Sequence, residues 1–246
     1  MLSDIWAIML KEWKEILVRR GQARTAILTM LIVPIGVLGV YLPLQIGPAW
    51  VGTPAFLAAG LWLPQLLSLG IVADSFAGER ERHTLETLLA TRLSDLSILI
   101  GKIAAIVVYA CGLSLTSAAT GLAALNLRYR LPHWILPEPK SVLALTAFAL
   151  LSSGFAAGVG VLISLRAATV RQAQQTLSMI TLAITFGLLI GIGSLPESWK
   201  RAIADWTASP DHGKQALALG MILAFINLAL FAAARARFRR NRLILD

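Results

Sequence analysis

The charged residues between Ser75 and Lys102 are the ones whose types and spacing could support a specific interaction. Polar residues fill almost every position from Glu79 to Glu86, and Glu and Arg alternate at its start. A helix that binds only anionic lipid is rich in Lys and Arg on its polar face. The mixed signs therefore favour ion pairs with a protein partner, and an ordinary solvated loop is the alternative interpretation.

Catalytic and metal-binding patterns are absent from the sequence. The single cysteine, Cys111, lies in an apolar run, and the three histidines are far apart, without the spacing of metal ligands. No G-x-x-x-x-G-K-[ST] motif is present to cradle a nucleotide. Ser152 and Ser153 have no His or Lys nearby in the sequence. We expect no enzymatic activity and no cofactor or metal in this chain.

Long apolar runs must position the charged stretch. The 246 residues are 57% hydrophobic and only 14% charged, and the mean hydropathy is +0.73. One crossing of a bilayer needs roughly 20 apolar residues. We therefore expect an all-α, polytopic integral membrane protein with six transmembrane helices. The predicted spans are residues 25–43, 55–74, 98–125, 141–165, 172–195 and 215–235 of the transmembrane domain 25–246.

Two amphipathic segments lie outside the predicted spans. Residues 1–24 carry Trp6 and Trp13 on an apolar side and Lys11 and Glu12 on the opposite side, which predicts a helix in the membrane interface. Residues 196–208 begin with proline, contain two tryptophans and predict a short external or re-entrant helix before the last span. Basic residues follow the last span and predict a further membrane anchor: Arg237, Arg239 and Arg240.

The distribution of basic residues predicts the orientation. With six spans, both termini, the polar stretch Ser75–Lys102 that contains the loop 78–97, and the link 166–171 share one side, and that side holds sixteen of the 22 Lys and Arg residues. By the positive-inside rule this side is cytoplasmic. We therefore expect a multi-pass protein of the plasma (inner) membrane with both termini in the cytoplasm. The net charge of +9 is explained by this bias. No groove-reading element or aromatic pattern indicates nucleic acid.

The polar loop resembles a known family. The string A-G-E-R-E-R-H-T-L-E-T-L-L at 77–89, followed by Gly101-Lys102, is similar to the first cytoplasmic loop of type-2 ABC transporter permeases, which reads G-E-R-E-x-G-T-L-E-x-L-L. His83 stands where that pattern has Gly, and Arg92-Leu93 stands where a Pro is common. The resemblance implies a coupling helix that docks on an ATPase subunit. The implied docking residues are Gly78, Glu79, Arg80, Glu81, His83, Thr84, Leu85, Glu86, Leu88 and Leu89.

The resemblance also implies a function. The chain is expected to be the permease subunit of an ABC exporter, paired with a second permease copy or a paralogue and with two ATPase subunits that bind ATP and magnesium. The alternative is a membrane scaffold or assembly factor that binds a cytoplasmic partner through the same loop and transports nothing. An ion-coupled carrier is disfavoured, because no acid or base lies in the middle of a predicted span.

Overall fold

The structure is a computed structural model of the whole chain. It describes residues 1–18, 32–33, 35–84, 87, 90–130, 132–208 and 212–238. Helices make up almost all of this described part, which contains no strand. The predicted all-α class is therefore confirmed for these residues.

The helices follow one another with short connections. The long ones are α4 (Pro54–Ala73), α7 (Asp95–Tyr129), α8 (Pro139–Ser164), α9 (Val170–Gly193) and α11 (His212–Arg237). The shorter ones are α1 (Leu2–Val18), α3 (Leu42–Ile46), α5 (Glu79–Glu81) and α10 (Glu197–Ala208). Two π-helical turns, Ile35–Tyr41 and Asp74–Gly78, and a 3₁₀ turn, Pro48–Gly52, connect some of them.

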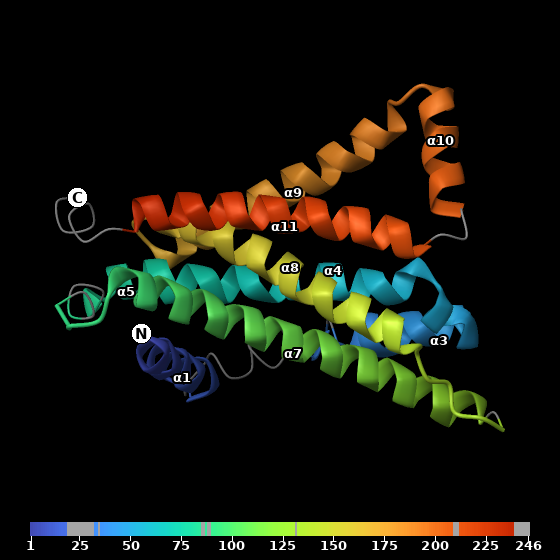
Figure 1. Cartoon of the computed structure of the whole chain (residues 1–246), viewed down its shortest axis with the longest axis horizontal. Helices are drawn as coiled ribbons and strands as arrows, with labels where there is room; N and C mark the ends of the chain where they lie inside the picture. The colour runs from blue at the N-terminus through green and yellow to red at the C-terminus, as the bar shows by residue number, and fades with distance from the viewer. Residues whose placement is uncertain are drawn as a thin grey trace.

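Four long helices form the bundle that positions the polar loop. In Figure 1, α4, α7, α8 and α11 run side by side along the long axis, while α1 lies across α7 near one end. α9 leaves the bundle near that end and diverges from it, so that α10 stands apart from the other helices (Figure 1). The N-terminus, α5 and the C-terminal end of α11 lie at the same end (Figure 1).

Within the part of the chain that the structure describes, three helices are long and apolar enough to cross a membrane. They are α7, α8 and the part of α11 from Gly213 to Arg237. This finding supports the membrane localisation predicted from composition. Residues 25–31 and Pro34 of the predicted first span, 25–43, lie outside the described residues, and its described end is part of the short apolar helical segment Ile35–Ile46.

A proline inside α4 is compensated by the neighbouring helix. Pro64 has no backbone N–H, so the carbonyl of Gly60 loses its usual helical donor. The Ser152 hydroxyl of α8 donates to that carbonyl at 3.0 Å, and the Ser68 hydroxyl donates to the carbonyl of Pro64 at 2.6 Å. Neighbouring side chains commonly replace backbone bonds that a proline breaks in a membrane helix. Ser152 thus has a structural role.

The helix that enters the polar loop is continuous with α4. The predicted coupling helix begins near Glu79, where α5 continues the helical path that starts at Pro54 and passes through the turn Asp74–Gly78. His83 then takes a left-handed φ of 55°. Glycine adopts that conformation without a steric penalty, and histidine tolerates it better than most residues. The Gly of the family pattern thus matches the backbone conformation that His83 adopts.

Candidate functional site

A buried lysine joins three helical elements beneath the polar loop. Lys102 is completely buried near the start of α7. Its ammonium lies 2.7 Å from Glu12 Oε1 and 2.9 Å from Glu79 Oε2, and it donates to the carbonyl of Ser75 at 2.9 Å. A charge in such a place is tolerated only when it is paired and hydrogen-bonded. Lys102 therefore ties α1 and the end of the α4 path to α7.

A second lysine completes the network on the outer side. Lys11 of α1 binds Glu79 Oε1 and lies 3.3 Å from Glu12 and 3.0 Å from Glu15. The Ser75 hydroxyl donates to Glu12 Oε2 at 2.7 Å. We call Lys11, Glu12, Ser75, Glu79 and Lys102 the ion cluster. The carboxylates of Glu12 and Glu79 are almost fully buried, so the charges need one another.

The crossing of α1 over α7 allows this close approach. Gly101 faces the backbone of α1, where an added Cβ would lie 2.8 Å from Ile8 Cβ and 3.1 Å from the carbonyl oxygen of Ile5. The Trp13 indole N–H donates to the carbonyl of Ala105 at 3.0 Å, one turn further along α7. A side chain at Gly101 would push the helices apart. The Gly-Lys pair of the sequence motif thus supplies both the contact and the buried charge.

The ion cluster shifts the pKa values of Glu12 and Lys11. Burial alone would raise the pKa of Glu12, but the nearby charge and hydrogen bond of Lys102 outweigh it and hold that pKa below its usual 4.5. Burial alone would lower the pKa of Lys11, but its hydrogen bond to Glu79 and the nearby carboxylates raise it above 10.5. Both groups are therefore charged at neutral pH.

Acidification is expected to destabilise the protein through Glu12. The pKa of Glu12 is lower in the folded chain than in the unfolded chain. Its contribution to the free energy of unfolding is therefore complete above pH 4.5 and disappears as the pH falls through the folded-state pKa. Thermal unfolding between neutral pH and about pH 3 should show a larger fall in Tm for the wild type than for Glu12→Gln. Equal falls would contradict this role of Glu12.

The same carboxylates lie close enough together to be considered as a metal site. Oxygens of Glu12, Glu15 and Glu79 lie within 4.8 Å of one another, and such oxygens suit Mg²⁺ or Ca²⁺. However, the ammonium groups of Lys11 and Lys102 already neutralise these carboxylates and would repel a divalent cation. The donor set therefore fits an internal salt-bridge network and does not fit a metal centre.

The structure separates the predicted docking residues into groups. Gly78 and Glu79 are buried, Arg80 is half-buried, and Glu81, His83 and Thr84 are exposed. The side chains of Arg80 and Glu81 bond to other helices of the same chain. Leu85, Glu86, Leu88 and Leu89 lie outside the described residues. Leu93, further along the predicted apolar stripe, packs against the bundle core.

The N-terminal helix differs from its prediction on one face. Glu12 was expected on the polar side of a helix in the membrane interface, but it is buried against Lys102. The partners lie 90 residues apart in sequence, so no local pattern could reveal the pair. Trp6 is 55% exposed, as a membrane anchor requires, whereas Trp13 bonds to α7. Arg237 is exposed at the end of α11, and Arg239 and Arg240 lie outside the described residues.

Comparison with known families decides the identity of this arrangement. Residues 3–208 match the family model of the ABC-2 type transporter. The chain belongs to this family. As an ABC-2 type transporter chain, it is a membrane permease, and the matched range holds α1, the ion cluster and the polar loop. None of the curated proteins compared with the chain matches it. The predicted resemblance to type-2 ABC permeases is confirmed.

Proposed function

We propose that this ABC-2 permease is the membrane subunit of an exporter powered by a separate ATPase that docks on the loop after α5. The observation that carries the proposal is the ion cluster, which joins α1 and α7 to the end of the helical path that continues α4, directly beneath that loop. A push on the loop would move these helices together. The chain itself supplies no nucleotide motif, so ATP and magnesium belong to the partner.

Helix lengths and the positions of the first and last helices support a six-span arrangement. α4 has 20 residues and α9 has 24, so at about 1.5 Å per residue each is long enough to cross the roughly 30 Å of hydrocarbon. Phe76 beside the loop contacts Phe238 after α11, with ring centroids 6.1 Å apart. α1 lies at the same end. Termini that share one side require an even number of crossings, and the basic residues favour the cytoplasmic side.

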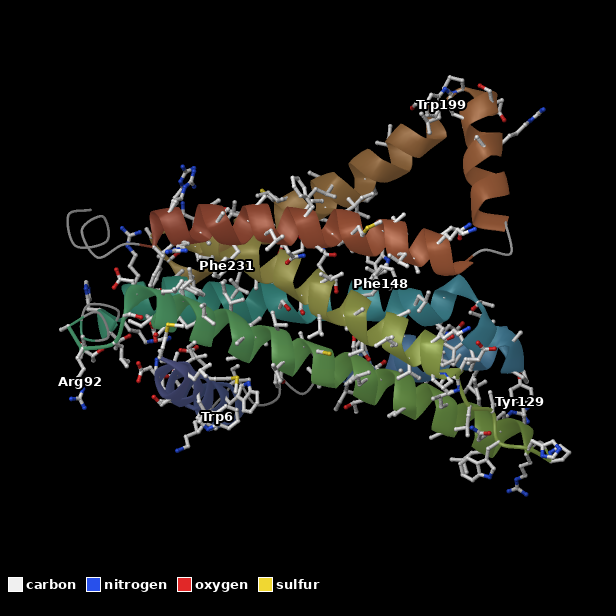
Figure 2. The ribbon with its side chains drawn as sticks, viewed as in Figure 1. Trp6, Arg92, Tyr129, Phe148, Trp199 and Phe231 are labelled. Carbon is white, nitrogen blue, oxygen red and sulfur yellow. The ribbon has the colours of Figure 1, made fainter. Side chains whose placement is uncertain are left out.

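The proposed docking surface lies on the exposed side of the polar loop and includes the expected residues His83 and Thr84. Glu79 is enclosed in the ion cluster, so it supports the loop from below and does not reach a partner. The exposed described residues of the loop include Arg82, His83, Thr84, Thr87, Thr91 and Arg92. Figure 2 shows Arg92 pointing away from the bundle at this end. We assign the ATPase contact to this surface, which carries basic side chains.

A second permease copy has room beside α9. In the described part of the chain, added Cβ atoms at Gly187 and Gly191 would meet nothing within 4 Å. Several large apolar residues of the same helix are exposed, namely Met179, Leu182, Ile184, Phe186 and Ile190. Small residues at this spacing allow close helix packing. We therefore place the second copy or paralogue against α9, with two ATPase subunits below the pair.

Reversing an exposed charge tests the docking surface. A basic docking surface requires an acidic surface on its partner, so Arg92→Glu, which places like charges together, should lower the affinity for the ATPase subunit roughly tenfold. The matched control is Arg130→Glu, an exposed arginine after the other end of α7. The measurement is co-purification and titration of the two proteins in lipid.

Three results would count against the proposal. Equal binding of both variants would overturn the docking surface. If no ATPase associates with the wild-type chain, the exporter proposal fails and the loop becomes the docking site of a scaffold. If the chain alone hydrolyses ATP, the assignment of ATP to a separate subunit fails.

A further inference from the structure

Two neighbouring residues of the polar loop reach the junction between α8 and α9. The Arg80 guanidinium donates to the carbonyl of Leu165 at 2.9 Å. The Glu81 carboxylate accepts the backbone N–H of Val170 at 2.8 Å. Leu165 is the residue that follows α8, and Val170 is the first residue of α9. One short helix thus holds both ends of a connection more than 80 residues away.

The charges of these two residues match the helix ends that they touch. The C-terminal end of a helix carries partial negative charge on its free carbonyls, and the N-terminal end carries partial positive charge on its free amides. Arg80 meets the C-terminal end of α8, and Glu81 meets the N-terminal end of α9. The order of the two residues is therefore specific, because exchanging them would put each charge at the wrong end.

Packing holds α9 mainly near this junction. Ala173 and Leu177 are buried against Ala73 and Ala77 of the α4 path. The apolar residues from Met179 to Ile190 that face outward are largely exposed, and α9 diverges from the bundle along this part (Figure 1). The contacts made by the first two turns of α9 therefore determine the tilt of the rest of the helix. A change at Val170 is amplified along the rest of the helix.

We propose that Arg80 and Glu81 are positioning residues that make α9 follow the polar loop, so that movement of the loop tilts α9 as well as the helices covalently joined to it. This inference rests on the proposed function for the source of the movement. α4 and α7 flank the loop in the chain and move with it directly. α8 and α9 lie further along the chain and are joined to α5 by the bonds from Arg80 and Glu81.

The experiment measures where α9 lies. Spin labels are attached to cysteines introduced at Ile190 on α9 and Val108 on α7, which are 66% and 45% exposed. The background variant Cys111→Ala removes the native thiol. Labelled chain is diluted with unlabelled chain in lipid nanodiscs, so that only distances within one chain are observed. Roughly 20 Å of helix separates Leu177 from Ile190, so a tilt of about 15° would move Ile190 by about 5 Å.

Two variants and one control test whether the order of the two charges matters. The swap Arg80→Glu/Glu81→Arg keeps composition and net charge, and it should broaden the distance distribution or shift it by about 5 Å. The conservative pair Arg80→Lys/Glu81→Gln retains a donor for Leu165 and an acceptor for Val170, so it should resemble the wild type. The control is a swap of the exposed pair Glu197 and Lys200, whose charged atoms lie 2.9 Å apart. A wild-type distribution in the Arg80/Glu81 swap would overturn the inference.

Adding the ATPase subunit tests the transmission itself. With ATP, the distance should change in the wild type and in the conservative pair. The Arg80/Glu81 swap should still bind the ATPase but lose the ATP-dependent change. A merely structural pair would leave that change intact, and this result would overturn the inference. If the wild type binds no ATPase, the proposed function fails, while the distances in the chain alone still decide whether the two residues position α9.

Discussion

Replacing Lys102 by methionine is expected to lower the stability of the protein by about 3–5 kcal/mol. Methionine fits a buried apolar site, but it leaves the buried carboxylates of Glu12 and Glu79 without their closest cation. Lys11 remains near both, at the more exposed side of the cluster. An uncompensated buried charge costs more than the lost pair contributed. Thermal unfolding in lipid should show a fall in Tm on the order of 10 °C.

A second variant separates charge from packing. Lys102→Met/Glu12→Gln removes one charge of each sign, and the amide oxygen still accepts a bond from Ser75. It should recover about half of the loss. If Glu12→Gln lowers the stability of Lys102→Met as much as it lowers the stability of the wild type, the two side chains do not interact. In that case, the ion cluster would not be the element that joins α1 to α7.

The sequence predicted the parts of the fold that depend on local patterns. Charge-free runs indicate apolar helices, and α7, α8 and α11 are found where such runs occur. A proline inside an apolar helix leaves a backbone carbonyl that a neighbour must satisfy, and Ser152 does so for Pro64. Residues 196–208 predicted a short helix, and α10 is present at that place. Each of these signals lies within one stretch of sequence.

The candidate site was only partly predictable, because its bonds connect distant segments. The motif contains Glu79 and Lys102, but nothing local indicates that Glu12 completes their network. Lys102 is a lone charge at the start of an apolar run, which is the only local signal of a buried partner. Likewise, Arg80 and Glu81 resembled an exposed charged face, yet they bond to the ends of α8 and α9.

Small residues in α8 face two different helices. Gly154 and Gly158 approach α11, where added Cβ atoms would lie 2.5 Å from Asn227 Oδ1 and 2.9 Å from Leu230 Cβ. Gly160 approaches α4, where the same construction gives 2.3 Å to Val72 Cγ1. Two positions along a helix turn the side chain by about 200°. These glycines of α8 therefore serve opposite faces, and their spacing alone could not assign them to partner helices.

Gly160→Ala is expected to destabilise the protein by about 1–3 kcal/mol. The new methyl group meets Val72, which is fully buried and has a branched, restricted side chain, so α4 and α8 must separate. The control is Gly112→Ala in α7, where nothing lies within 4 Å and the greater helix propensity of alanine should raise stability by up to about 1 kcal/mol.

A compensating change identifies the cause of the effect. Val72→Ala removes the methyl groups that clash, so the cost of Gly160→Ala should shrink when it is measured in the Val72→Ala background. The measurement is thermal unfolding of the four combinations in lipid. If Gly160→Ala raises Tm as Gly112→Ala does, α4 and α8 do not pack closely at this point. The path that joins the ion cluster to α8 would then depend on the bond from Arg80 to Leu165.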